Sequence, residues 1–163
     1  AVTAASLLIL YSFQSLILDM SGNTGTQSLA VTIRVLNEEA ISGKEKLKFI
    51  LKEMRIGLMN GLIIGTLAFV AVGLYLAFVP GALAAGTPKY YGFEISACIG
   101  ISLVAGMLMA SLDGTLVPIF FKKIGIDPAV ASGPLITTLN DLIAVCVYYG
   151  VSLLLFVQIG LFH

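Results

Sequence analysis

The chain has 163 residues, of which 58% are hydrophobic and only 11% are charged. Soluble domains carry about 25% charged residues, so this composition excludes an ordinary water-exposed globular surface. The nine basic and nine acidic residues cancel, and the net charge gives no reason to expect a nucleic-acid partner. We therefore expect an integral membrane protein.

Four apolar segments are long enough to cross a bilayer, which takes roughly 20 apolar residues. They cover about residues 1–36, 56–79, 93–121 and 128–162. The first and last exceed a simple span, so we expect them to tilt, break or protrude. Strand-like alternation is lacking, which argues against a β-barrel. The sequence predicts an all-α integral membrane bundle of about four long helices, with residues 1–163 as a single transmembrane domain.

The first apolar segment contains a polar stretch at residues 19–28. Its glycines, Gly22 and Gly25, weaken a helix and allow a neighbouring backbone to approach closely. One interpretation is structural, with small and polar residues joining this helix to its neighbours.

The functional interpretation of the same stretch rests on one helix face. On a helix, Asp19, Asn23, Arg34 and either Gln27 or Thr26 lie on the same side. Charged and amide groups facing lipid are costly, so this face must contact protein or a water-filled cavity. We predict that it lines a polar cavity.

A connector of about residues 37–55 follows. Together with Arg34, it holds six of the nine basic residues, and its apolar positions recur at helical spacing. This pattern predicts a short amphipathic helix at the membrane interface. By the positive-inside rule, residues 37–55 and 122–127 are cytoplasmic and residues 80–92 lie outside. The chain would then start outside, so we expect a further helix before Ala1 in a longer protein.

Asp113 lies in the cytoplasmic half of the third apolar segment, among small apolar neighbours. Structural and functional interpretations of this residue both stay open. Cys98 and Cys146 lie within apolar runs and are predicted to be buried small residues without a metal role.

The last segment opens with Asp127 and Pro128, which read as a helix N-cap and a first helical residue. Pro134 is expected to disturb the helix about a turn later and to free backbone carbonyls. Measured from Pro128, Asp141 would lie roughly 20 Å along the helix, near the membrane middle.

Asp141 shares a helix face with Pro134 and either Thr137 or Thr138. Residues 128–162 contain no Lys or Arg that could pair with it, so a cation from solution is its natural partner. Carboxylate, amide and hydroxyl oxygens suit hard divalent cations, and magnesium in particular keeps much of its water. Calcium and manganese remain possible on ligand type alone, whereas no cluster for soft metals is present.

Two motifs resemble those of MgtE-type magnesium channels and related solute carriers. Residues 21–28, Ser-Gly-Asn-Thr-Gly-Thr-Gln-Ser, with Ile33-Arg34 after them, resemble the family's Gly-Gly-Asn-x-Gly-x-Gln-Ser…Ile-Arg motif. Residues 125–141 resemble its final helix. The chain differs in having Ser21 where glycine is usual and Asn140 before the aspartate, and it lacks the family's first helix and cytoplasmic regulatory domains.

The resemblance implies a multi-pass homodimer in the cell membrane, with a pore on the two-fold axis lined by the helices that carry the two motifs. Asp141 matches the pore aspartate, which holds a largely hydrated Mg²⁺. Weaker candidates from the resemblance, and Asp19 from this chain's own helix face, complete the predicted metal-site residues: Asn23, Thr137, Thr138, Asn140 and Asp19.

The function that we expect is divalent cation transport, most simply permeation of magnesium, and not an enzymatic activity. Without the regulatory domains, the chain folded alone would leak constitutively. Two alternatives stay open. An intramembrane aspartyl protease would use two of the buried acids, with Asp113 in a weak motif match. A purely structural scaffold would be indifferent to loss of Asp141.

Overall fold

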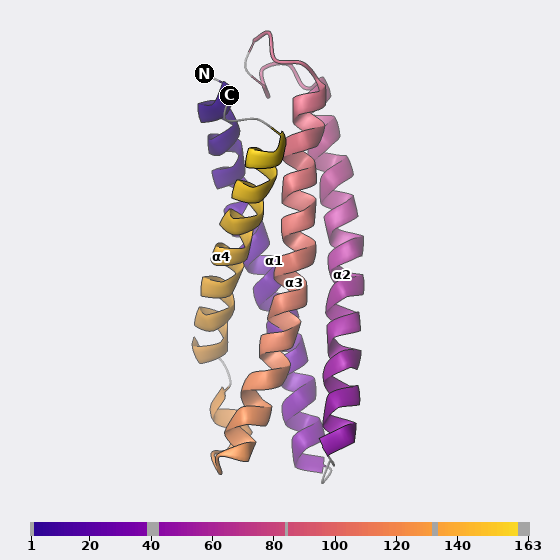
Figure 1. The fold of residues 1–163 in the computed structure, drawn as a ribbon, viewed down its shortest axis with the longest axis vertical. Coiled ribbons are helices and arrows are strands. Elements are labelled where there is room, and N and C mark those ends of the chain that lie inside the picture. The colour runs from indigo at the N-terminus through magenta and orange to yellow at the C-terminus, as the bar shows by residue number, and fades with distance from the viewer. Residues whose placement is uncertain (1, 39–42, 84, 132–133, 160–163) are drawn as a thin grey trace.

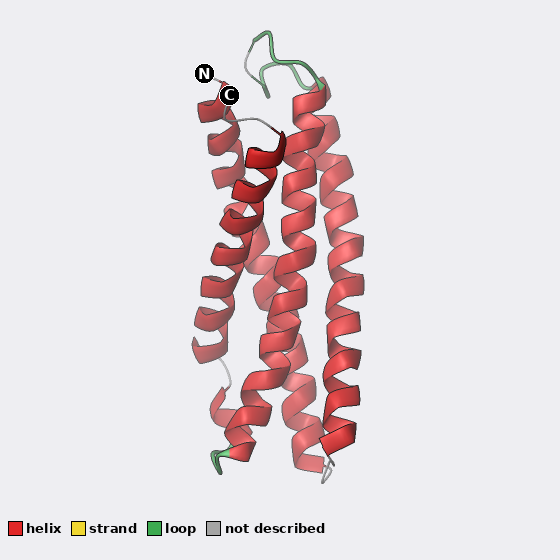
Figure 2. Cartoon of the chain, viewed as in Figure 1, coloured by secondary structure: helices red, strands yellow, loops and turns green. Residues whose placement is uncertain are grey.

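The computed structural model describes residues 2–38, 43–83, 85–131 and 134–159. Within these ranges the chain forms four α-helices and one short 3-10 helix: α1 (Val2–Glu38), α2 (Gly43–Phe78), α3 (Tyr90–Lys123), η1 (Pro128–Ala131) and α4 (Pro134–Ile159). Figure 2 shows that this described part of the chain is helical and contains no strand. The predicted all-α fold is confirmed.

In the part of the chain that the structure describes, three helices are long and apolar enough to cross a membrane: α2, α3 and residues Pro134–Leu155 of α4. The helix α1 is as long as these, with 37 residues, but carries the polar stretch 19–28 near its middle. The chain is therefore an integral membrane helical bundle, as the sequence predicts.

The helix α3 lies at the centre of the bundle and packs against α1, α2 and α4, while α1 also packs against α4. Figure 1 shows that the end of α1, the start of α2 and the end of α3 share one end of the bundle. The connection between α2 and α3 lies at the opposite end, near the N-terminus. This arrangement leaves α1 and α4 side by side along one wall.

Small residues bring α2 and α3 into close contact. A Cβ atom added to Gly65 would lie 2.7 Å from the carbonyl oxygen of Gly100, and one added to Gly61 would lie 2.9 Å from the Cα of Val104. Without a hydrophobic driving force between helices in lipid, close packing of this kind holds them together. The helix α3 is thereby held closely against α2, and it also contacts α1 and α4.

Buried hydrogen bonds join the remaining helices. The Ser28 and Ser111 hydroxyls lie 3.0 Å apart, and Ser111 Oγ donates to the carbonyl oxygen of Glu53 at 2.7 Å, which connects α1, α3 and α2. Toward the other end, Tyr148 Oη of α4 donates to the carbonyl oxygen of Leu10 at 2.6 Å. The buried apolar residues form two clusters, one that includes Ile17, Ile99 and Tyr148 and one that includes Leu29 and Ile136.

Two expectations about helix boundaries need revision. Residues 43–55 of the predicted connector form the first turns of α2 and continue without a break into the second apolar segment, while residues 39–42 lie outside the described part. In the last segment, Pro128 opens only the short η1, and α4 begins at Pro134. Asp141 therefore lies about 10 Å into its helix, rather than roughly 20 Å.

The cysteine prediction was half right. Cys98 is buried and donates to Ser152 Oγ at 3.4 Å, which links α3 to α4, but Cys146 is exposed on α4. An apolar run does not distinguish a side chain facing the bundle from one facing lipid, because both surroundings are apolar.

Candidate functional site

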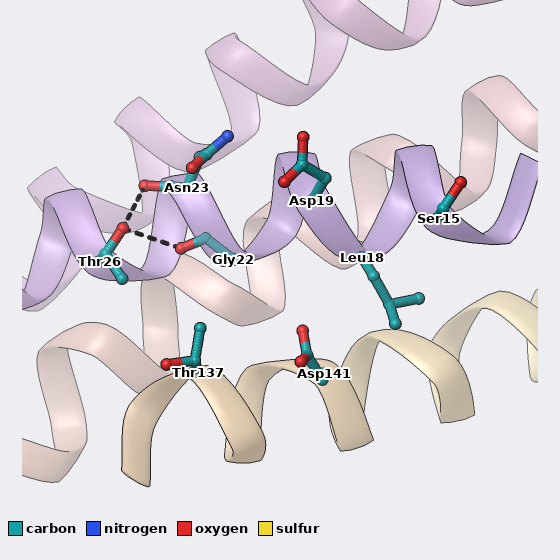
Figure 3. A pocket seen from close by; sticks show the side chains of 8 residues that line it. All are labelled: Ser15, Leu18, Asp19, Gly22, Asn23, Thr26, Thr137 and Asp141. Atoms are coloured by element: carbon teal, nitrogen blue, oxygen red, sulfur yellow. Dashed lines mark hydrogen bonds between the residues drawn. The ribbon is translucent and has the colours of Figure 1, made fainter. Parts of the chain in front are cut away.

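A cavity of about 360 Å³ lies between α1 and α4 (Figure 3). Apart from Leu18 and Gly22, its lining side chains all carry oxygen. The complete lining is Ser15, Leu18, Asp19, Gly22, Asn23, Thr26, Thr137 and Asp141. No Lys or Arg is among these residues, so the cavity has acidic character.

The polar lining from α1 follows the helical repeat. Ser15, Asp19, Gly22 and Thr26 are spaced three or four residues apart, which places them along one side of the helix. Thr26 Oγ1 lies 3.0 Å from the carbonyl oxygens of Gly22 and Asn23, to which it donates. Its hydrogen is thus directed to the backbone, and its lone pairs remain free to accept from water or to face a cation.

The helix α4 contributes Thr137 and Asp141, which are one turn apart. Figure 3 shows both side chains extending from α4 toward α1. Asp141 is half-buried, whereas Asp19 and Asn23 are exposed. The helices thus bring two carboxylates from opposite ends of the chain to one cavity whose outer side is open.

Four of the six residues predicted for the metal site line this cavity: Asp19, Asn23, Thr137 and Asp141. Thr138 does not line it, and its hydroxyl donates to the carbonyl oxygen of Pro134 in its own helix at 2.7 Å. Thr26 also lines it, which resolves the choice between Thr26 and Gln27 on the Asp19 face in favour of Thr26.

Asn140, the sixth, is turned toward α1 instead of into the cavity. It is only 1% exposed, and a methyl group added to Gly25 would overlap its amide. Neither Oδ1 nor Nδ2 of Asn140 has a hydrogen-bond partner among the described residues. The close backbone approach expected at Gly25 is made by Gly114 of α3, and the Asn140 side chain packs on the same glycine. Ser132 and Gly133 of the second motif lie outside the described part.

A second cavity of about 250 Å³ lies on the other side of α1, facing α2 and α3. Its polar lining consists of Asn23, Thr24, Gln27 and Asn60. Asn23 thus borders both cavities. The sequence analysis missed Asn60 and Ser15. Asn60 is the one amide side chain in residues 56–79, and Ser15 extends the Asp19 face by one helical turn.

Asp113 is separate from this group. It lies on α3, and its Oδ2 atom is buried without a hydrogen-bond partner in the described residues. It does not line the cavity that contains Asp141, where the second acid is Asp19. The pairing of Asp113 with Asp141 that a protease would need is absent from that cavity.

Within the described ranges, no three His, Cys, Asp or Glu side chains come together to hold a metal ion. The α1–α4 cavity offers two carboxylates together with hydroxyl and amide oxygens. Such a set fits an ion that keeps several of its waters, because Mg²⁺ gives up water reluctantly and is usually held by one or two carboxylates.

Comparison with known proteins identifies the family of the chain. Residues 14–151 match the MgtE family model, described as a divalent cation transporter. Proteins named magnesium transporter MgtE are 35% identical over 86% of the chain in Bacillus subtilis, 37% over 93% in Enterococcus faecalis and 33% over 95% in Thermus thermophilus.

The chain spans 28–30% of the length of these curated relatives. The match nevertheless contains both polar motifs and the whole α1–α4 cavity, since it begins before Ser15 and ends after Asp141. A transporter family also agrees with the expectation that the chain is not an enzyme. The chain belongs to the MgtE family of divalent cation transporters.

Proposed function

We propose that this chain carries Mg²⁺ across the membrane along a path lined by α1 and α4, with Asp141 as the principal ion-binding residue. The observation that carries the proposal is that Asp141 and Asp19 line the same oxygen-rich cavity between helices of a membrane bundle. Ionisable groups at such positions mark ion paths by default, because they are otherwise too costly to keep in a bilayer.

The size of the cavity fits a hydrated ion. Six water molecules occupy roughly 180 Å³ in the liquid, and the cavity measures about 360 Å³. Mg²⁺ can therefore lie there with its inner water shell in place. The two carboxylates attract it, while hydroxyl and amide groups accept from or donate to its waters. Binding through water stays weak enough to let the ion leave, as conduction requires.

The choice of magnesium within the hard cations rests on the relatives, which are named magnesium transporters. The chemistry of the cavity supports a hard cation, because the polar side-chain atoms of its lining residues are oxygens, apart from the amide nitrogen of Asn23. Calcium and manganese use the same ligands and serve as the competing ions in any test.

The open side of the cavity supports a homodimer. Ser15, Asp19, Asn23 and Thr137 are exposed on the outer surface of this wall. In Figure 3, Asp19 and Asn23 project from α1 on the side away from α4. Facing lipid, these groups would be costly. A second copy related by a two-fold axis would cover the wall and bring a second Asp141 to the same path, and two-fold dimers are the commonest assembly of identical chains.

The basic residues support one orientation. Eight of the nine lie at the end of the bundle where α1 ends, α2 begins and α3 ends, and the ninth, Lys89, precedes α3 at the opposite end. The Lys122 ammonium donates to the carbonyl oxygen of Leu36 there. By the positive-inside rule, this end lies on the cytoplasmic side of the plasma membrane, which makes residues 37–55 and 122–127 cytoplasmic.

Uptake into proteoliposomes tests the function itself. Vesicles containing the purified protein and a magnesium-sensitive dye should take up Mg²⁺ faster than protein-free vesicles, with K⁺ as the matched monovalent control. If Mg²⁺ enters no faster than in protein-free vesicles while the protein is folded and inserted, the proposed function is wrong.

A further inference from the structure

The outer face of α2 carries a groove near the cytoplasmic end that the ion path does not involve. It has a volume of about 340 Å³ and is lined by six residues spaced three or four apart or adjacent on one helix face: Lys48, Leu51, Lys52, Arg55, Ile56 and Met59. We propose that this groove binds an anionic phospholipid, with the phosphate held by the three cations and an acyl chain lying along the apolar residues.

The lining of the groove carries three positive charges and no negative one. The structure shows no ion pair for Lys48, Lys52 or Arg55 within its described residues, and no acidic side chain is among the six lining residues. The nearby Glu53 is turned into the bundle, where it is 3% exposed and accepts from Ser111 through its backbone carbonyl. A phosphodiester would satisfy these cations, and Arg55 can bind two of its oxygens at once.

The apolar half of the groove leads into the lipid-facing surface of α2. Met59 is 62% exposed, and Ile63 and Leu67, which continue along the helix, are 57% and 61% exposed. From Lys48 to Met59 the helix rises by about 16 Å. The headgroup layer on each side of the hydrocarbon is about 5–7 Å thick. The groove therefore crosses from headgroup depth into the hydrocarbon, which matches the polar-to-apolar sequence of a single phospholipid molecule.

The leaflet also fits. Anionic lipids give the cytoplasmic leaflet a negative surface potential, and each Lys or Arg near that surface adds to binding. The cationic end of this bundle is the one that the positive-inside rule places there. A free anion would use only the three cations, whereas a phospholipid uses the whole groove, so we commit to the phospholipid.

Native mass spectrometry of the purified full chain tests the proposal. The protein is equilibrated in micelles that contain equal amounts of phosphatidylglycerol and phosphatidylcholine. The groove variant is K48Q/K52Q/R55Q. The matched control, K44Q/K46Q/K123Q, removes three cations from the same end of the bundle without touching the groove. We expect the wild type and the control to retain phosphatidylglycerol in preference, and the groove variant to retain at least about tenfold less.

A second variant separates lipid from free anion and keeps all the charges. Met59→Gln should lower retention of phosphatidylglycerol, and excess inorganic phosphate should fail to displace the lipid from the wild type. Equal losses in the groove variant and the charge-matched control would reduce the effect to diffuse electrostatics and overturn the proposal. Retention at the wild-type level in the groove variant, or complete displacement by phosphate, would overturn it as well.

Discussion

The Asn140 side chain of α4 lies directly against the backbone of Gly25 in α1, so that a methyl group on this glycine would overlap the amide. Gly114 of α3 approaches Gly25 from another side, close to its carbonyl oxygen. Three helices therefore meet at one glycine. The junction lies next to the wall of the cavity, and its packing sets how closely α1 and α4 approach there.

Gly25→Ala is therefore expected to destabilise the bundle by about 1–3 kcal/mol, the usual cost of overpacking a filled site. Gly22→Ala is the matched control, since a Cβ atom there meets nothing within 4 Å. It should be neutral or stabilise by up to about 1 kcal/mol through the higher helix propensity of alanine. Unfolding in detergent followed by circular dichroism measures both, and equal effects would show that the contact with Asn140 is not the cause.

Tyr148 and Tyr149 form a second matched pair. The buried Tyr148 hydroxyl donates to the Leu10 carbonyl, whereas the exposed Tyr149 hydroxyl donates to Gln14 Oε1 at 2.7 Å. We expect Tyr148→Phe to lower the free energy of unfolding by about 1 kcal/mol and Tyr149→Phe to change it by less than about 0.5 kcal/mol. The same unfolding measurement applies, and a larger loss in Tyr149→Phe would contradict the assignment of the buried bond.

The proposed dimer predicts contacts between copies along the cavity wall. In a background without Cys146, Thr137→Cys should form a disulfide-linked dimer on oxidation in membranes, because this exposed wall would face the second copy in that dimer. Leu67→Cys, on the 61% exposed outer face of α2, should not. Non-reducing gel electrophoresis reads out the products. Cross-linking at residue 67 but not at residue 137 would place the interface elsewhere.

Asp19 is predicted to assist Asp141 and not to replace it. It lines the same cavity but lies on its open side, whereas Asp141 is half-buried. Asp19→Asn should slow Mg²⁺ uptake only in part and raise the Mg²⁺ concentration needed for half-maximal uptake. Unchanged uptake at every concentration would remove Asp19 from the path.

Much of this arrangement could be read from the sequence because lipid imposes simple rules. Apolar length predicted the positions of the helices, and helical periodicity placed Asp19 and Asn23 on one face with either Gln27 or Thr26. Both rules are local and need no knowledge of the partner helix. The same periodicity placed Asp141 on one face of the last segment with either Thr137 or Thr138, and the resemblance to the family's motifs predicted that the two helices line one path.

What could not be read depends on contacts between helices. Thr138 and Asn140 are adjacent in sequence to residues of the cavity wall, yet one bonds its own helix and the other packs on Gly25. Only the rotation of α4 against α1 decides this. The predicted start of α4 was wrong for a local reason. Pro128 and Pro134 are both acceptable first helical residues, and the chain begins η1 at Pro128 and α4 at Pro134.

The measurement that tests the central claim most directly is Mg²⁺ uptake by proteoliposomes containing Asp141→Asn, compared with Asp127→Asn. Both variants remove one carboxylate, but Asp127 lies outside the cavity and caps η1 by accepting from the Ala129 amide at 2.9 Å, a bond that asparagine can also form. We predict that Asp141→Asn reduces uptake to nearly that of protein-free vesicles while Asp127→Asn keeps it. Wild-type uptake in folded, membrane-inserted Asp141→Asn would contradict the account.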